Sequence, residues 1–152
     1  MSDILFRTEN RIFSYRTAGI LVHDGVKYID TIDEIASHQL QGFFVGWRSP
    51  LTPERHYELL RGSTHFIAAL DDNKVVGFIT ALSDGVISAF IPLLEVLPEY
   101  KNRGIGSELV RRMLEKLENI TNIDLTCDPD LQPFYENFKM LRSTGMILRK
   151  YK

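Results

Sequence analysis

A short glycine-spaced turn with two basic residues offers the clearest chemistry in this sequence. Gly104 and Gly106 lie in Lys-Asn-Arg-Gly-Ile-Gly-Ser, residues 101–107, between a predicted strand and a predicted helix. The first N–H groups of a helix have no acceptor within the helix, and the helix dipole adds partial positive charge there. Glycine lets an anion approach the backbone, and Lys101 and Arg103 add full charges. The turn predicts a phosphate site, although a glycine pair also serves where only turn geometry is needed.

Two better-known phosphate-binding loops do not match this turn. A P-loop ends in Gly-Lys-Ser/Thr, whereas Gly106 is followed by Ser107 and Glu108. A dinucleotide-binding fingerprint requires a third glycine where this chain has Leu109, and it comes early in a βαβ unit. Both loops are therefore set aside.

A strand and a helix must position the turn. The apolar run at residues 87–97 predicts a long strand, and Pro92 within it predicts a bulge, an edge or a local splay because proline cannot donate to a sheet. After the turn, apolar residues recur at helical spacing, with charged residues on the other side of the predicted helix. The apolar stripe consists of Ile105, Leu109, Val110, Met113, Leu114 and Leu117.

The remaining segments complete an expected order of β-α-α-β-β-β-α-β-α-β. Period-two alternation predicts the strands, and apolar residues at helical spacing predict the helices. Thr52 before Pro53 is typical of a helix N-cap followed by a proline in the first turn. The expected elements are a strand at 11–19, helices at 28–42 and 52–62, a hairpin at 64–82, a strand at 122–128, a short helix at 131–141 and a closing strand at 144–151. This order predicts an α/β fold on a mixed sheet.

Length and composition restrict the class of protein. The 152 residues predict one domain, residues 1–152, and 44% hydrophobic with 25% charged residues is typical of a globular chain. A net charge of -2 argues against a nucleic-acid partner. The first residues show neither a signal peptide nor a membrane span, so a cytoplasmic protein without a membrane partner is expected. One cysteine, Cys127, and four scattered histidines predict no metal site.

The turn and the strand before it resemble a known family. The pattern Gln/Arg-x-x-Gly-x-Gly/Ala, here starting at Lys101, follows Leu-x-Val-x-Pro-Glu-Tyr at residues 94–100. With these motifs the sequence resembles the GNAT superfamily of acetyl-CoA-dependent N-acetyltransferases, and its predicted element order is the family's order. Residues 134–140, Phe-Tyr-Glu-Asn-Phe-Lys-Met, resemble the family's Phe-Tyr-x-x-x-Gly-Phe segment. The departures are Lys101, where the family usually has Gln or Arg, and Lys139-Met140 in place of Gly-Phe.

The resemblance covers nearly all 152 residues. It implies a GNAT-like acyl-CoA N-acyltransferase fold with a splayed central sheet, and acetyl-CoA as co-substrate without a metal. The backbone N–H near Val96 would face the thioester carbonyl and stabilise the oxyanion formed during attack. The residues implied to contact acetyl-CoA are Leu94, Val96, Lys101, Asn102, Arg103, Gly104, Ile105, Gly106, Ser107, Asp128 and Phe134.

Direct attack requires a neutral amine, so a base or a water relay must remove a proton from an ammonium group whose pKa is about 8 to 10. Glu95 is the first candidate. In a regular strand it would share a face with Ile91, Leu93 and Leu97, where burial would raise its pKa. There are two alternatives. A bulge would reverse the orientation of the side chain, or the carboxylate would be solvated or paired with a cation. The weaker candidates are Asp84, which also suits a turn, and Asp128.

Tyr135 matches the family tyrosine that protonates the departing thiolate, since a phenol keeps its proton at pH 7. The alternative is a helix tyrosine that packs beside Phe134 and Phe138. Cys127 is expected to be a buried apolar residue rather than an acetyl acceptor, because no histidine lies near it in sequence to activate it.

Aromatic residues mark the expected acceptor pocket. Phe43, Phe44 and Trp47, and Phe90 from the long strand, would bind an apolar, aromatic or cationic amine, or else anchor the core. The leading prediction is an N-acetyltransferase that acetylates a small-molecule primary amine in a ternary complex. The alternative is a CoA-binding regulatory or interaction module, and a third prediction is a longer acyl-CoA donor. A monomer or a homodimer is expected, with the C-terminal Met-Ile-Leu-Arg-Lys-Tyr-Lys run as an exposed edge or a dimer contact.

Overall fold

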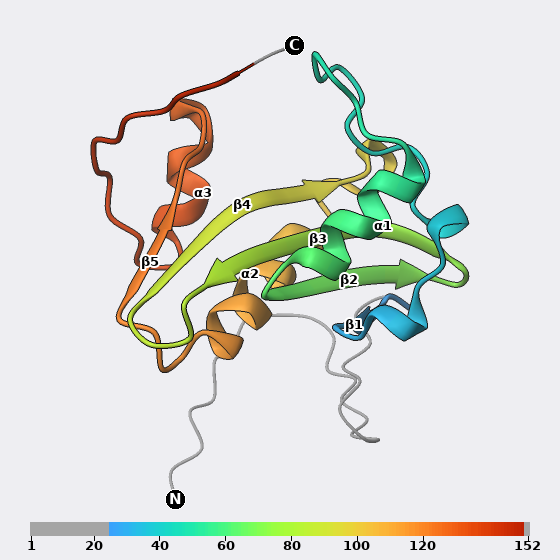
Figure 1. Cartoon of the computed structure of the whole chain (residues 1–152), viewed down its shortest axis with the longest axis horizontal. Coiled ribbons are helices and arrows are strands. Elements are labelled where there is room, and N and C mark those ends of the chain that lie inside the picture. Colours follow the sequence, from blue (N-terminus) through green and yellow to red (C-terminus); the bar gives the residue numbers. More distant parts are fainter. Residues whose placement is uncertain (1–24, 151–152) are drawn as a thin grey trace, which may run out of the picture.

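The computed structural model describes residues 25–150, so the strand expected at 11–19 lies outside the described residues. These residues form a five-stranded sheet whose strands lie side by side in chain order (Figure 1). The strands are β1 (Lys27–Ile29), β2 (His65–Asp71), β3 (Lys74–Ser83), β4 (Ser88–Val96) and β5 (Asn122–Leu125). The pairs from β1 to β4 are antiparallel and β5 is parallel to β4. The predicted mixed sheet, including the 64–82 hairpin, is confirmed.

Two helices cover opposite faces of the sheet, and a third lies beside β5 (Figure 1). They are α1 (Pro53–Gly62), α2 (Ile105–Lys116) and α3 (Gln132–Glu136). The expected N-cap is confirmed, because Thr52 Oγ1 accepts the N–H of Arg55 at 3.3 Å. Two short 3-10 turns, η3 (Pro98–Tyr100) and η4 (Pro129–Leu131), precede α2 and α3.

Each face of the sheet carries its own hydrophobic core. The predicted apolar stripe of α2 is buried against one face, where Leu109 and Met113 are fully buried. On the other face, Leu60 of α1 packs with Phe78 and with the segment before α1. A Cβ on Gly77 of β3 would lie 3.2 Å from side-chain atoms of Ile105, Leu109 and Val96. Glycine therefore lets α2 approach β3 closely.

The prediction of a helix at 28–42 is wrong. Tyr28 and Ile29 belong to β1, and the rest forms two 3-10 turns, η1 (Ile32–Glu34) and η2 (Ser37–Gln39), separated by extended residues. Apolar residues that recur every three positions also fit 3-10 turns, and the β-branched residues Ile and Thr lower the helix propensity. The amide side chain of Gln39 fixes this path, since it accepts the N–H of Ala36 and donates to Asn73, both at 2.7 Å.

The prediction of a closing strand is also wrong for its described part, because residues 144–150 form no strand. Apolar residues in this segment are exposed, and Met146 and Leu148 retain 102% and 78% of their accessible surface. A strand needs a partner for its backbone, and no described segment supplies one here. The alternation of residue types in this segment did not reveal that a partner segment is absent.

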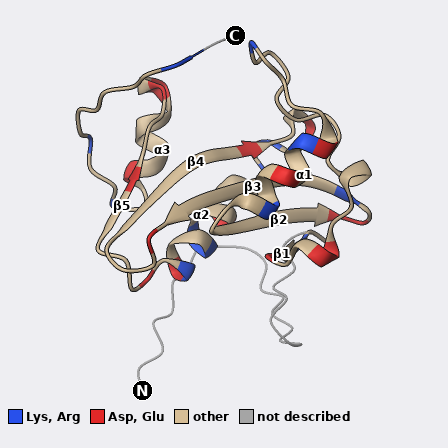
Figure 2. Ribbon diagram, in the orientation of Figure 1, with Lys and Arg blue, Asp and Glu red and all other residues tan. Residues whose placement is uncertain are grey.

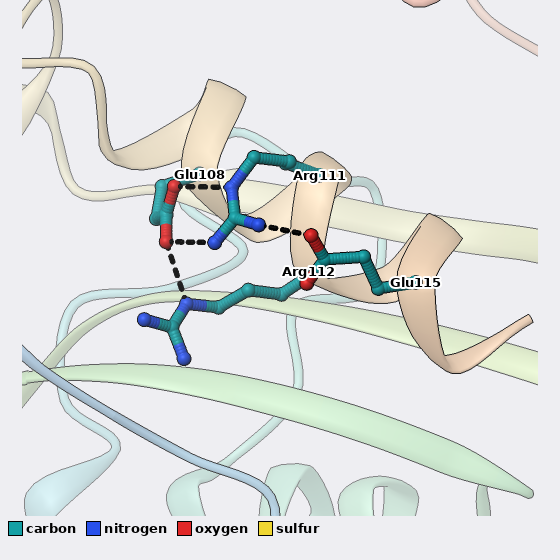
Figure 3. Close-up of polar contacts among 4 residues, drawn as sticks. All are labelled: Glu108, Arg111, Arg112 and Glu115. Carbon is teal, nitrogen blue, oxygen red and sulfur yellow. Dashed lines mark hydrogen bonds and ion pairs between the residues drawn. The ribbon is translucent and has the colours of Figure 1, made fainter. Parts of the chain in front are cut away.

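A charged cluster on α2 contacts β1, the first strand at the edge of the sheet. Glu108 accepts from Arg111 Nε at 2.8 Å and from Arg112 Nε at 2.7 Å, and Arg111 also pairs with Glu115 (Figure 3). Burial opposes the charge of Glu108, but the two arginines hold its pKa below the usual range. The Arg112 guanidinium lies 4.5 Å from the ring centroid of Tyr28 in β1. The cluster thus holds β1 against α2.

Candidate functional site

A gap opens in the sheet where β4 leaves β5. The two strands pair only from Ser88 opposite Asn122 to Ile91 opposite Leu125, and residues 92–96 of β4 continue without β5. Pro92, which has no N–H, stands at the first unpaired position. This is the local splay that proline predicted.

Backbone donors of β4 face this gap. The N–H of Leu97 donates to Val76 of β3 at 2.9 Å. Because successive residues of a strand direct their backbone groups to alternate sides, the N–H groups of Leu94 and Val96 point away from β3. The open edge therefore presents the N–H that the resemblance implies for Val96.

The glycine-spaced turn begins α2 with backbone donors of its own. Gly104 has φ of 81°, a left-handed conformation that favours glycine, and the first helical bond runs from Glu108 N–H to Gly104 O at 3.0 Å. The N–H groups of residues 105–107 consequently have no acceptor within the helix. Lys101 is exposed and has no ion-pair partner among residues 25–150, while Arg103 lies 4.9 Å from the ring centroid of Tyr100.

Three residues from different elements meet beside the turn. A Cβ on Gly106 would lie 3.8 Å from Val96 Cγ2 and 3.9 Å from Phe134 Cζ. The end of β4, the start of α2 and the middle of α3 therefore converge at the mouth of the gap. Val96 and Phe134, like Leu94, also pack against the core beneath α2. Three residues implied to contact acetyl-CoA are thus brought together.

Tyr135 occupies the far side of the gap, on α3. Its ring is half-buried and lies 4.9 Å from that of Phe134, in an edge-to-face arrangement. Burial raises the pKa of the phenol, and the neighbouring Cys127 raises it further, so the group keeps its proton at neutral pH. Burial and nearby Asp128 and Asp130 raise the pKa of the Cys127 thiol, which opposes formation of a nucleophilic thiolate. Asp128 itself is exposed just before η4.

Glu95 lies on the other face of the sheet. Its Oε1 accepts the N–H of Phe44 at 2.9 Å. Burial raises the pKa of Glu95, while the Phe44 N–H and the charge of Lys101 oppose that rise. Glu95 is thus neither fully solvated nor ion-paired at a short distance among the described residues.

A bulge decides which neighbours Glu95 has. The register between β3 and β4 shifts between Thr80 and Leu82, and the side of β4 that packs under α2 changes from Ile91 to Leu94 across Pro92. Glu95 shares its face with Leu93 and Leu97 as expected, but the expectation for Ile91 is wrong because the bulge reverses the alternation. The same reversal brings Phe90 to the face of Glu95.

The aromatic residues of the expected acceptor pocket divide into two groups. Phe43 and Phe44 are 6% and 1% exposed and pack with His56 and Phe78, so their side chains anchor the core. Trp47 and Phe90 are 52% and 38% exposed and present rings to solvent. Phe44 adopts φ of 61°, which is unusual for a bulky residue and places its N–H on Glu95.

Sequence reasoning missed one residue that shapes the site. Gly77 permits the close approach of α2, and no local pattern distinguishes it from other strand glycines. His56 is 1% exposed, and neither of its ring nitrogens has a hydrogen-bond partner in the described structure. Burial lowers the pKa of His56 to about 4.

Asp84, a weak candidate base, accepts three backbone N–H groups at 2.8 to 3.0 Å in the turn before β4.

The described residues also limit other kinds of site. Within residues 25–150, no group of three or more His, Cys, Asp or Glu side chains is arranged to hold a metal ion. In the same range, no helix has both the length and the apolar character that crossing a membrane requires.

Comparison with known proteins assigns this arrangement to a family. A sequence profile of the Acetyltransferase (GNAT) family matches residues 32–140. A solved structure from Deinococcus radiodurans R1, described as an acetyltransferase, is 40% identical, with a TM-score of 0.82 over 86% of this chain and 92% of that one. A GNAT family acetyltransferase from Streptococcus pneumoniae TIGR4 is 28% identical, with a TM-score of 0.65 over 84% of this chain and 99% of that one.

Curated relatives match over shorter stretches. The chloroplastic GCN5-related N-acetyltransferase 2 of Arabidopsis thaliana is 35% identical over 68 residues, which are 43% of this chain and 26% of that protein. An N-acetyltransferase of Pyropia yezoensis, itself uncharacterized, is 27% identical over 105 residues, 64% of this chain and 59% of that protein. The chain thus spans less than two thirds of the length of these relatives. The family profile and the similar structures carry the assignment: this chain belongs to the GNAT family of acetyltransferases.

Proposed function

We propose that this protein transfers an acetyl group from acetyl-CoA to the primary amine of a small molecule, by direct attack in a ternary complex. The observation that carries the proposal is the convergence of Val96, Gly106 and Phe134 where β4 leaves β5. The unpaired backbone N–H groups of β4, the basic turn at residues 101–107 and the protonated phenol of Tyr135 all border this gap. Membership of the GNAT family supports acetyl transfer as the reaction.

The residues around the gap fit acetyl-CoA. The pyrophosphate would bind the N–H groups of Ile105, Gly106 and Ser107, because the N-terminus of α2 provides donors and positive dipole charge. Side chains of the turn would add contacts from Lys101, Asn102 and Arg103, with Gly104 left open to the anion. The pantetheine arm would follow the free edge of β4 at Leu94 and Val96, with Phe134 and Asp128 on the opposite side.

Three groups would carry the reaction. Glu95 would accept a proton from the acceptor ammonium, directly or through water, so that the nitrogen lone pair can form the new C–N bond. The Val96 N–H would stabilise negative charge on the carbonyl oxygen. Tyr135 would donate its proton to the sulfur as the C–S bond breaks, and would regain a proton from the acylated nitrogen through solvent. Acetyl-CoA and an ammonium thereby give an N-acetylamine, CoA and one proton.

The acceptor would enter from the face of Glu95. Trp47 and Phe90 are exposed on this side and would bind the apolar part of the amine, while buried Phe43 and Phe44 would fix the loop that holds Glu95. A ring face also attracts an ammonium group, which suits a cationic acceptor. We expect a cytoplasmic enzyme.

Calorimetric titration of the full chain with acetyl-CoA and with CoA tests the first half of the proposal. We expect micromolar dissociation constants for both ligands. Thiol release across a panel of primary amines, with acetyl-CoA and longer acyl-CoA donors, then tests transfer. Binding without turnover on any amine would support a CoA-binding module instead. An absence of binding would overturn the proposal entirely.

A further inference from the structure

The two basic residues of the turn at residues 101–107 have different surroundings. The Arg103 guanidinium lies 4.9 Å from the ring centroid of Tyr100, and the Tyr100 hydroxyl donates to Asp71 at 2.8 Å. Arg103 is therefore fixed beside the end of β2. Lys101 is exposed and has no ion-pair partner among residues 25–150. Its charge is available to a ligand or to a neighbouring carboxylate.

Glu95 is the carboxylate on which this charge acts. β4 carries a single acidic residue, Glu95, near the end of the strand (Figure 2). The 3-10 turn η3 folds the chain back after β4, and the Lys101 N–H donates to Pro98 O at 3.3 Å. The Lys101 charge consequently reaches Glu95 without forming a direct ion pair among the described residues.

The proposed pyrophosphate site lies on the opposite face of the same strand. Val96, the neighbour of Glu95, packs toward α2, and a Cβ on Gly106 would lie 3.8 Å from Val96 Cγ2. A pyrophosphate bound to the N–H groups of residues 105–107 would therefore lie one strand away from the Glu95 carboxylate. Charges about 10 Å apart still interact when protein rather than salt solution separates them. Negative charge at the turn thus acts on Glu95.

The surroundings of Glu95 leave this interaction largely to Lys101. Glu95 Oε1 accepts the Phe44 N–H at 2.9 Å, and Glu95 stands opposite Phe78 of β3. The titratable side chains that pack in or against this core are His56, Tyr57 and Tyr100. Burial lowers the pKa of His56 to about 4, and phenols carry no charge at pH 7, so these groups are neutral there. The charge of Lys101 opposes the rise in the pKa of Glu95 that burial causes.

We propose that acetyl-CoA binding at the turn makes Glu95 a stronger base, because the pyrophosphate takes up the charge of Lys101 and adds negative charge across β4. A fraction of the Glu95 carboxylates then binds a proton from the buffer as the co-substrate binds. The base reaches its full strength only in the complex that is ready to react with an amine. Lys101 acts through Glu95 and is a positioning residue. This coupling rests on the proposed function.

Titration of Glu95 in the absence of ligand tests its contact with Lys101. In protein with isotope-labelled glutamate carboxyl groups, the NMR signal that disappears in Glu95→Gln identifies Glu95. We expect its titration midpoint to move to higher pH in Lys101→Gln, because a stabilising positive charge is lost, and to stay in place in Lys101→Arg. Lys101 is exposed, so both variants retain the fold.

Lys116→Gln is the matched control, since it removes a lysine charge at the other end of α2, where Lys116 pairs with Asp30 at 2.7 Å. It should leave the Glu95 midpoint unchanged. A midpoint that moves equally in Lys116→Gln and Lys101→Gln, or in neither, would overturn the role of Lys101.

Proton uptake on binding tests the coupling itself. CoA is titrated calorimetrically into the full chain in two buffers of different ionisation enthalpy, and the difference in heat gives the number of protons taken up per CoA bound. The phosphate monoester of CoA also titrates, at a pH of about 6, so comparison with Glu95→Gln isolates the part due to Glu95. We expect greater uptake by the wild type than by Glu95→Gln.

The same comparison in a Lys101→Gln background measures the share of Lys101. The excess uptake should shrink there, while CoA affinity falls by less than about tenfold because the backbone donors remain. CoA binding with equal proton uptake by wild type and Glu95→Gln would overturn the coupling and leave the CoA site intact. A complete absence of CoA binding would overturn the proposed function, and the coupling with it.

Discussion

The backbone N–H of Phe44 donates a 2.9 Å hydrogen bond to Oε1 of Glu95, which lies 51 residues further along the chain. This bond joins the loop before α1 to the strand that borders the gap. It also fixes a carboxylate whose pKa burial has raised. The loop and the proposed base therefore form one unit.

Replacing Glu95 with Gln should lower kcat/KM for the best amine by about a hundredfold, because no side chain then accepts the ammonium proton. Glutamine can still accept the Phe44 N–H, so the free energy of unfolding should change little. Thiol release as a function of pH is the measurement. The wild-type rate should rise as pH passes upward through the raised pKa of Glu95, and this limb should vanish in the variant.

Glu99→Gln is the matched control, since Glu99 is exposed, four residues away, and paired with Lys74. It should retain the wild-type pH profile. Equal losses in the two variants would remove Glu95 from the mechanism.

Replacing Tyr135 with Phe should reduce kcat by about a hundredfold while acetyl-CoA affinity stays within twofold, because only the proton donor is lost. Steady-state kinetics and calorimetry separate the two quantities. Tyr57→Phe, at a partly buried tyrosine on α1, controls for loss of a hydroxyl elsewhere. Full turnover of the Tyr135 variant would assign the ring to packing against Phe134 alone.

Replacing Gly104 with Glu should weaken CoA binding by about a hundredfold or more, equal to about 2.7 kcal/mol. The new side chain adds negative charge at the start of α2 and strains a backbone with φ of 81°. Gly85→Glu controls for strain, because Gly85 has φ of 72° and equally open surroundings. Calorimetry with CoA is the measurement. If both variants bind CoA like the wild type, the turn does not hold its phosphates.

His56 should make the protein less stable in mild acid. Its pKa is about 4 in the folded state and about 6.5 in the unfolded state, so the unfolded state binds the proton more tightly as pH falls below 6.5. This difference should remove about 2 kcal/mol of unfolding free energy between pH 7 and pH 5. Urea unfolding at the two pH values is the measurement.

A His56→Leu variant should lose that part of the pH dependence, whereas His38→Leu, at an exposed site, should keep it. Parallel pH profiles of wild type and His56→Leu would show that His56 is not buried in its neutral form. The aromatic side chains around Phe44 would then not enclose a neutral His56.

Replacing Gly77 with Ala should destabilise the protein by about 1 to 3 kcal/mol, because the added methyl group overlaps Ile105, Leu109 and Val96 at 3.2 Å. Displacement of α2 should also weaken CoA binding through the attached turn. Chemical denaturation and calorimetry measure the two effects. Gly62→Ala, with open space around its Cβ position, should show neither. An unchanged stability of Gly77→Ala would mean that α2 does not depend on this close approach.

Local chemistry in the sequence determined the turn, α1, α2, the hairpin and the splay at Pro92. Each depends on short-range rules: Thr52 caps a helix, glycine adopts a left-handed turn at Gly104, and proline cannot donate to a sheet. The family motif at residues 94–106 follows from the same stretch. These features could be read without knowledge of the rest of the chain.

Only the tertiary structure decided which side chains share a face and which segments find partners. A bulge between β3 and β4 turned Glu95 away from Ile91, and the contact with Phe44 reaches Glu95 from a loop that lies 51 residues earlier in the chain. The alternating C-terminal segment had the pattern of a strand but found no partner among the described residues. Strand formation and side-chain direction depend on long-range hydrogen bonds and on register, and one inserted residue reverses every side chain beyond it.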